Sequence, residues 1–245
     1  MFNMKNQYTS IILVIGNEIL SGKTQDTNSR FLASRLFARG IDVIRCVTIP
    51  DIMPVIVSEI RESSPRCDFL FSMGGIGSTP DDLTRQAFAE AFNRKLVRNP
   101  EAESMMRKFH KDKINEMRLR MADLPENCSL IENPFFGAPG FIVENCYVLP
   151  GVPEILVGMY ENIEPSLPFL PRFIKKLRTD RYEGEFADIM TEIQDGNPDV
   201  RIGSYPAFRN PEYAVELTFD GRDENRVDDV MKIFEEKLKD LPKRS

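Results

Sequence analysis

Short apolar runs alternate with helical patterns through the first 92 residues of the chain. The apolar runs have the length and side chains of strands that are buried on both faces. Strand, helix, strand alternation is typical of parallel sheets with right-handed crossovers, so we predict an α/β fold with a mostly parallel sheet. The predicted strands are residues 10–15, 41–49 and 68–73, and the predicted helices are residues 28–39, 51–63 and 80–92.

The pattern changes after residue 163, where the segment 164–171 carries three prolines and indicates a linker. Before it we expect a polar helical extension at 99–122, short strands at 129–132 and 145–149, and a helix at 153–162. Beyond it, strands are expected at 172–179, 200–205 and 213–219, with helices at 184–194 and 224–241. The chain is therefore predicted to hold two domains, residues 1–165 and a smaller α+β domain of residues 166–245.

Composition excludes several classes of function. The net charge of -6 argues against an electrostatic grip on nucleic acid or on an anionic membrane. The apolar run at 11–15 is far shorter than the roughly 20 residues of a membrane span. The four cysteines form no CxxC pair, which favours free thiols in a reducing, cytoplasmic compartment. With His110 as the only histidine, a His-based zinc site or a Ser-His-Asp triad is not expected.

The main candidate site is the glycine-rich segment GGIGSTPDDLT, which begins directly after the third predicted strand. Glycines let the backbone turn sharply and present its N–H groups to a ligand oxygen. We expect Pro80 in the first helical turn, Thr79 as the N-cap and Asp82 closing a capping box. The helix dipole then favours an anion in the same space. The predicted ligand-binding residues here are Gly74, Gly75, Ile76, Gly77, Ser78, Thr79 and Thr84.

The two aspartates of this segment are candidates for different tasks. Asp82 has a structural alternative as a helix cap, whereas Asp81 is the better candidate for chemistry. A carboxylate repels a phosphate unless a cation lies between them, and Mg²⁺ prefers oxygen ligands and phosphates. We therefore predict Asp81 and Asp82 as catalytic residues, and Asp81 and Asp51 as ligands of a divalent cation, Mg²⁺ or Co²⁺.

Further glycine- and proline-containing turns follow the other apolar runs. Each one alone is an ordinary turn, but the carboxyl ends of parallel strands meet at one edge of a sheet, where ligands bind. Thr27 or Asn28 has a capping alternative at the start of its helix. The predicted ligand-binding residues of these turns are Gly16, Asn17, Glu18, Asn28, Gly137, Pro139, Gly140, Pro150, Gly151, Pro153 and Glu154.

Taken together, the stretch from Gly16 to Asn28, the GGIGSTPDDLT loop and the GAPGF and LPGVPE turns resemble the molybdopterin-binding-like domain of CinA-type proteins. The same domain is similar to the amino-terminal part of FAD synthases and, more distantly, to MoaB, MogA and MoeA. The resemblance covers roughly residues 9–163, and the GSYP stretch at 203–206 looks like the small carboxy-terminal subdomain of this group. It implies a three-layer α/β fold, a homo-oligomer, and a nucleotide or pterin ligand at the glycine-rich loop.

Three functions follow as alternatives from this resemblance. The first is metal-dependent pyrophosphate hydrolysis of a nucleotide such as ADP-ribose or FAD. The second is molybdopterin binding in molybdenum cofactor biosynthesis, and the third is a non-enzymatic nucleotide-binding module. Two residues depart from the family pattern: Ser78 stands where proline is usual, and Asn17 where aspartate is frequent.

Overall fold

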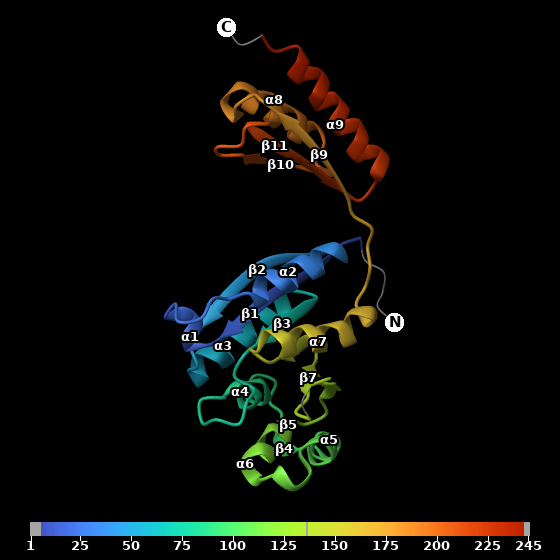
Figure 1. Ribbon diagram of the computed structural model, residues 1–245. Coiled ribbons are helices and arrows are strands. Elements are labelled where there is room, and N and C mark those ends of the chain that lie inside the picture. Colours follow the sequence, from blue (N-terminus) through green and yellow to red (C-terminus); the bar gives the residue numbers. More distant parts are fainter. Residues whose placement is uncertain (1–5, 136, 243–245) are drawn as a thin grey trace. The chain divides into compact units, whose positions relative to one another are not determined.

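The chain folds into two compact units, one ending at Phe169 and one beginning at Leu170 (Figure 1). The structure is a computed structural model that describes residues 6–135 and 137–242. Each unit has its own apolar core. The two units are therefore described one at a time.

The first unit is built on a six-stranded sheet in the order β2-β1-β3-β8-β7-β6. The first four strands in that order are parallel, and the last two pairings are antiparallel. The mostly parallel sheet predicted from the apolar runs is confirmed. The strands are β1 (Tyr8–Ile15), β2 (Ile41–Ile49), β3 (Phe69–Met73), β6 (Ser129–Ile131), β7 (Gly140–Val143) and β8 (Cys146–Leu149).

Helices cover both faces of this sheet, which gives the three-layer arrangement that the family resemblance implied. On one face, Ile11 and Leu13 of β1 share an apolar cluster with helices α3 and α4. On the other face, the ring of Phe71 lies 6.1 Å from that of Tyr160 on α7. This two-sided burial explains why the strands read as continuous apolar runs. The helices are α1 (Asn17–Leu20), α2 (Asn28–Ala38), α3 (Met53–Ser63), α4 (Thr84–Ala91) and α7 (Pro153–Ile163).

Between α4 and β6 the chain makes an excursion away from the sheet (Figure 1). It contains a two-stranded antiparallel ribbon, β4 (Leu96–Arg98) and β5 (Asp123–Pro125), that sequence analysis did not predict. The helical extension expected at 99–122 is present as α5 (Pro100–His110) and α6 (Glu116–Leu119), joined and followed by 3₁₀ turns.

Helix α4 begins later than predicted. The pattern placed its start at Pro80 with Thr79 as the N-cap, but the helix begins at Thr84 and Leu83 occupies the N-cap position. The segment before it forms tight turns, with the Asp82 N–H donating to the Thr79 carbonyl at 3.1 Å. The physical reason lies in the Asp82 side chain, which bonds to the loop and not to the first turn of a helix.

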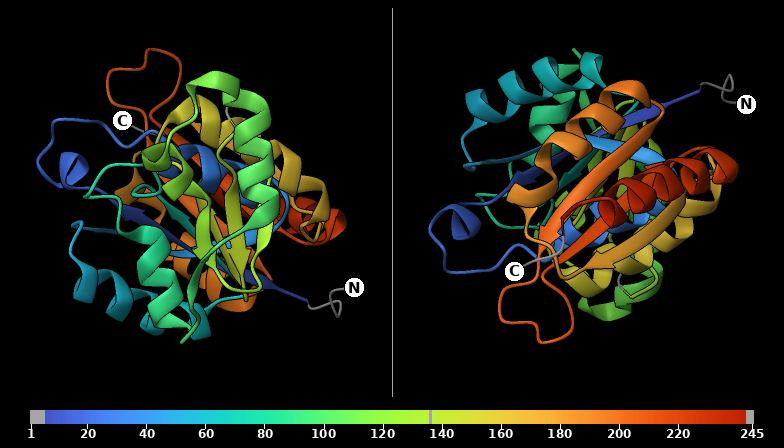
Figure 2. Two further views of the ribbon diagram at one scale, coloured as in Figure 1. Left: turned by 90° about the horizontal axis from the view of Figure 1, so that it is seen from below. Right: turned by 90° about the horizontal axis from the view of Figure 1, so that it is seen from above.

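The second unit is an antiparallel three-stranded sheet, β10-β11-β9, with two helices packed against it. Phe234 of α9 is fully buried among Phe186 and Phe219. The loop of residues 207–214 extends away from the sheet (Figure 2). The elements are β9 (Phe173–Thr179), α8 (Glu183–Gly196), β10 (Val200–Pro206), β11 (Val215–Gly221) and α9 (Glu224–Lys239), close to the predicted ranges.

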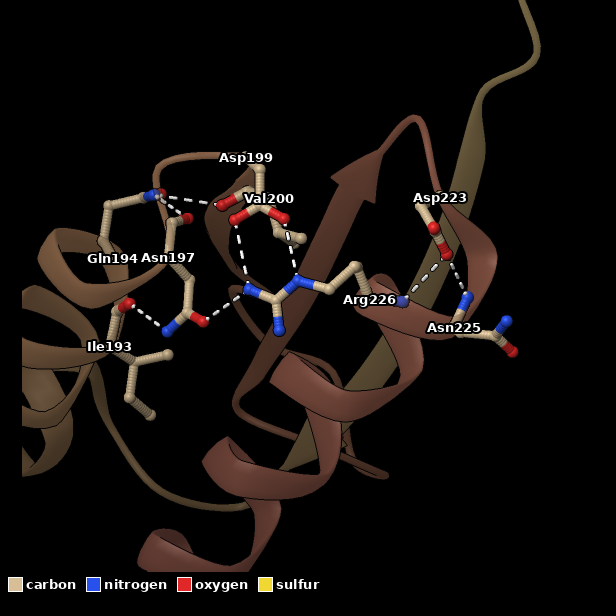
Figure 3. Close-up of polar contacts among 8 residues, drawn as sticks. All are labelled: Ile193, Gln194, Asn197, Asp199, Val200, Asp223, Asn225 and Arg226. Carbon is tan, nitrogen blue, oxygen red and sulfur yellow. Dashed lines mark hydrogen bonds and ion pairs between the residues drawn. The ribbon is translucent and has the colours of Figure 1, made fainter.

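A polar clasp ties the turn between α8 and β10 to helix α9 (Figure 3). The Arg226 guanidinium donates to both Asp199 carboxylate oxygens, at 2.9 and 3.1 Å, and to Asn197 Oδ1 at 2.9 Å. Asp223 caps the same helix by accepting from the N–H groups of Asn225 and Arg226. These contacts hold the start of α9 against the turn between α8 and β10.

Candidate functional site

The predicted loops meet at the carboxyl edge of the parallel strands. The Gly16 N–H donates to the Ile49 carbonyl at 3.1 Å, and the Gly74 N–H donates to the Leu149 carbonyl at 3.2 Å. The loops that follow β1, β3 and β8 are therefore neighbours, as expected for ligand sites in open α/β sheets.

A small cavity of about 60 Å³ lies at this edge. It is far smaller than the several hundred Å³, roughly, of pockets that enclose whole cofactors, so only part of a ligand fits inside it. Its lining combines predicted residues with neighbours that the prediction did not include. The predicted lining residues are Glu18, Asn28, Gly74, Gly151 and Pro153, and the others are Val14, Ile15, Ile19, Thr24, Gln25, Asp26, Thr27 and Met73.

Gly74 and Gly75 make the sharp turn out of β3. Both have positive φ, 97° and 65°. A Cβ on Gly74 would lie 2.1 Å from the Ile15 carbonyl oxygen, and one on Gly75 would lie 2.3 Å from Thr84 Oγ1. Backbone conformation and close approach thus both require glycine here.

Thr84 anchors this turn from the first residue of α4. Its hydroxyl donates to the Gly74 carbonyl at 2.8 Å, and its N–H donates to the Gly75 carbonyl at 3.1 Å. The side chain is completely buried. Thr84 therefore positions the turn.

Asp82 holds the middle of the loop. Its carboxylate accepts from the Gly77 N–H at 2.8 Å, the Thr79 N–H at 2.8 Å and the Thr79 hydroxyl at 2.5 Å. Asp82 thus has the structural role that sequence analysis gave as an alternative. Its hydrogen bonds go to the loop, however, and not to the N-terminus of a helix. Two of the N–H groups predicted for a ligand are bonded to this carboxylate.

Arg85 holds the same loop from its carbonyl side, and sequence analysis missed it. Its Nη1 donates to the carbonyls of Ile76 and Gly77, the latter at 2.6 Å. The side chain is 8% exposed. Burial lowers the pKa of its guanidinium, while the Asp82 and Asp123 carboxylates act in the opposite direction.

The sequence held a signal for Arg85. It precedes Phe88 and Ala89 by three and four residues, so it lies on the apolar side of the helix that follows the loop. A buried arginine needs acceptors, and the nearest backbone carbonyls are those of the glycine-rich loop.

Three amides of the loop are left for a ligand. Within residues 6–135 and 137–242, the N–H groups of Gly75, Ile76 and Ser78 donate to no protein acceptor. All three residues are partly exposed. Amides that converge on one turn are the donors that bind phosphate oxygens in other glycine-rich loops.

Asp81 differs from Asp82 in being exposed to solvent. The Thr79 hydroxyl and the N–H of Asp81 itself hold the pKa of its carboxyl below the ordinary value. The one proton of this hydroxyl is shared between the two aspartates, and the contact to Asp82 is 2.5 Å. Asp81 is therefore an exposed, ionised carboxylate in the same glycine-rich segment.

Asp51 lies after β2 and bonds to the loop after β1. Its carboxylate accepts from the Asn17 N–H at 2.8 Å. In the part of the chain that the structure describes, no three His, Cys, Asp or Glu residues gather into a group that could hold a metal ion. A role for Asp51 in holding a cation stays a prediction.

The start of α2 and the LPGVPE turn are joined directly. The Asn28 side chain is buried and donates to the Gly151 carbonyl at 2.8 Å. The capping alternative for Thr27 is wrong in detail, because its side chain makes no capping bond and Asp26 accepts from the Ser29 N–H instead. Asn28 thereby joins two loops that both line the cavity.

The remaining predicted residues divide between this edge and the excursion. Helix α7 begins at Pro153, with Glu154 in its first turn as expected. Pro139 and Gly140 are buried where β7 begins, and β7 runs antiparallel to β8. Gly137 instead packs against α5, where an added Cβ would lie 2.8 Å from Met106 Cα.

Comparison with known proteins agrees with this geometry. The family model described as probable molybdopterin binding domain matches residues 11–171. This range includes all the residues described at the sheet edge. The chain belongs to this family. A second model, the FAD synthase middle domain, matches residues 171–242 and so covers the second unit.

Individual relatives support the same assignment. A protein of Archaeoglobus fulgidus is 38% identical over 94% of this chain and 98% of its own length. A CinA-like protein of Thermosipho melanesiensis is 33% identical over 94% of this chain, which spans 59% of that protein. A crystal structure of the protein CinA with unknown function from Thermoplasma acidophilum matches 66% of this chain and 99% of its own, with 32% identity and a TM-score of 0.62.

These relatives confirm the resemblance to CinA-type proteins that the loop motifs carried. The fold and the family are thus established, and the matching family model describes a probable molybdopterin binding domain. Across the described residues, every helix is too short or too polar to serve as a transmembrane span.

Proposed function

We propose that this protein hydrolyses the pyrophosphate link of a nucleotide such as ADP-ribose or FAD, with the phosphates bound on the Gly74–Thr79 loop and a divalent cation as cofactor. The observation that carries the proposal is the set of unpaired amides at Gly75, Ile76 and Ser78, at the carboxyl edge of the sheet. Preorganised backbone donors stabilise charge that develops on phosphate oxygens, because they need no reorganisation during the reaction.

The residues present fit a cation that arrives with the nucleotide. Asp81 is the exposed carboxylate beside the amides, and its lowered pKa keeps it ionised. Mg²⁺ in phosphate sites is commonly bound through one or two carboxylates, with phosphates and waters completing its shell. A cation of this kind, Mg²⁺ or Co²⁺, would neutralise charge on the pyrophosphate, and Asp81, with Asp82 or Asp51, would hold it.

The other residues of the site position these groups. Thr84 and Arg85 fix the loop through its carbonyls, and the N–H groups of Gly75, Ile76 and Ser78 are left for the phosphates. Asn28 holds the Gly151 turn, and Glu18 folds its carboxylate against Gly16 at the cavity wall. Because the cavity is small, the nucleoside portion of the ligand lies over the exposed loops around it.

Molybdopterin binding is the second candidate, and the family model over residues 11–171 favours it. A pterin phosphate would use the same unpaired amides. The two candidate functions differ in whether a product is released. Only hydrolysis requires the cation and the Asp81 carboxylate.

Incubation of the purified protein with ADP-ribose, FAD or molybdopterin, with Mg²⁺, Co²⁺ or EDTA, separates the candidates. We expect AMP release from ADP-ribose or FAD that EDTA abolishes and that Asp81→Asn lowers by on the order of 100-fold or more. Glu90→Gln is the matched control, since Glu90 is another exposed carboxylate on the helix that follows the loop. Tight molybdopterin binding without AMP release would assign the second candidate and overturn the first.

A further inference from the structure

Asp82 makes the same kind of contacts to the loop that a bound phosphate would make. Its two carboxylate oxygens accept from the Gly77 N–H, the Thr79 N–H and the Thr79 hydroxyl, all within 2.8 Å. The N–H groups of Gly77 and Thr79 alternate along the loop with the unpaired N–H groups of Gly75, Ile76 and Ser78. One anion, belonging to the protein itself, therefore already occupies two of the five backbone N–H groups from Gly75 to Thr79.

The loop is built to admit this carboxylate closely. A Cβ on Gly77 would lie 2.6 Å from Asp82 Oδ2 and 3.0 Å from Oδ1, so only glycine leaves room for it. On the opposite side, Arg85 donates to the Ile76 carbonyl, which belongs to the same peptide group as the Gly77 N–H that bonds to Asp82. The loop backbone is thus shaped to accept the Asp82 carboxylate at Gly77.

We infer that Asp82 is an internal stand-in for a ligand phosphate: its carboxylate closes the loop in the free protein and is displaced when a pyrophosphate takes the Gly77 and Thr79 donors. This inference rests on the proposed function, since it assumes that phosphates bind at this loop. Two anions cannot share the same donors, because like charges at hydrogen-bonding distance repel. Ligand binding therefore requires Asp82 to turn away.

The displacement gives Asp82 a second task. Once it leaves the Gly77 and Thr79 amides, its carboxylate becomes available beside Asp81, where the cation that accompanies the phosphates is proposed to lie. Asp82 is therefore a positioning residue that couples loop opening to ligand binding. Without a ligand it keeps the loop closed and shields the donors.

The test is calorimetric titration of the full-length protein with inorganic pyrophosphate in EDTA. A closed state that must open lowers the apparent affinity by the fraction of open protein. We therefore expect Asp82→Asn, which keeps the shape but weakens the contact, to bind pyrophosphate on the order of tenfold more tightly than the wild type. Asp81→Asn is the matched control, since it removes the same charge one residue away without touching the Gly77 and Thr79 amides.

Amide hydrogen exchange supplies a readout that does not depend on affinity. In the wild type, the Gly77 and Thr79 amides should be protected without ligand, lose protection in Asp82→Asn, and regain it with pyrophosphate. Equal tightening in Asp81→Asn and Asp82→Asn, or weaker binding in Asp82→Asn, overturns the inference and leaves the proposed function standing. If neither the wild type nor a variant binds pyrophosphate in EDTA, the inference is wrong, and the AMP-release assay with Mg²⁺ or Co²⁺ still decides the proposed function.

Discussion

Asp82 and Arg85 hold the glycine-rich loop from opposite sides of one peptide chain. Asp82 Oδ1 accepts from the Gly77 N–H at 2.8 Å, while Arg85 Nη1 donates to the Gly77 carbonyl at 2.6 Å. The two residues are three positions apart and carry opposite charges, and the Asp82 carboxylate raises the pKa of the Arg85 guanidinium against the larger lowering by burial. The conformation of the loop therefore depends on these two side chains as well as on its glycines.

Replacing Arg85 tests its structural contribution. Arg85→Met leaves the Ile76 and Gly77 carbonyls without their donor, so we expect the free energy of unfolding of the first unit to fall by about 1–3 kcal/mol. Arg30→Met, at an exposed arginine of α2, is the control and should change it by less than about 0.5 kcal/mol. Chemical denaturation followed by circular dichroism measures both, and equal effects would contradict the role given to Arg85.

Gly74 is expected to be the least tolerant glycine of the loop. Gly74→Ala combines a φ of 97° with a contact of 2.1 Å to the Ile15 carbonyl, a backbone atom that cannot move aside. Gly22→Ala is its control, because Gly22 has a φ of 70° but nothing within 4 Å. We expect Gly22→Ala to cost about 1 kcal/mol and Gly74→Ala about 1–3 kcal/mol more, as measured by thermal unfolding. A similar loss of stability in both variants would show that the backbone moves to relieve the contact between the new Cβ and the Ile15 carbonyl, and would contradict the prediction.

The acid limb of the pH profile should depend on Thr79. The Thr79 hydroxyl is the largest cause that lowers the pKa of Asp81, so the carboxyl stays ionised, and able to hold a cation, as pH falls through the ordinary range for aspartate. In Thr79→Val the pKa rises toward its ordinary value, and the loss of nucleotide hydrolysis on acidification moves to higher pH. Carboxyl ¹³C NMR of Asp81 measures the shift directly, and an unchanged pKa would be evidence against this contact.

The second unit is expected to unfold without the first. Phe234 is fully buried, with its ring 5.9 Å from Phe186 and 5.6 Å from Phe219. Phe234→Ala should cost about 3–5 kcal/mol, enough to unfold a unit of marginal stability. Hydrogen exchange should then rise across residues 173–239 while β1 and β3 stay protected. A comparable loss of protection in β1 would show that the two units unfold together.

Much of the fold was predictable, because strands buried on both faces appear as apolar runs. The predicted strand at residues 41–49 matches β2 in full, and the other parallel strands differ by a few residues at their ends. The ribbon of β4 and β5 was not predictable in the same way, since its strands have three residues each. Strand β7 was hidden in the GAPGF turn, whose glycine and proline indicated a turn and not a strand.

The location of the site could be predicted from the sequence, but the hydrogen bonds within its loops could not. Strand ends identified which loops meet, and Gly16, Gly74 and Gly151 do lie at one edge. The competition between a helix cap and a loop contact at Asp82 is decided by tertiary contacts, namely the buried Thr84 hydroxyl on Gly74 and Arg85 on Gly77. A sequence pattern does not show which of these two contacts Asp82 makes. The predicted start of α4 was therefore four residues too early.

The central claim is that the unpaired amides of Gly75, Ile76 and Ser78 bind the phosphates of a nucleotide. Titration of ¹⁵N-labelled protein with ADP-ribose in EDTA, followed by amide NMR, tests it most directly. We predict saturable shift changes that are largest at these three amides and absent with adenosine, which lacks phosphate. Changes confined to other residues, or equal changes with adenosine, would contradict the account.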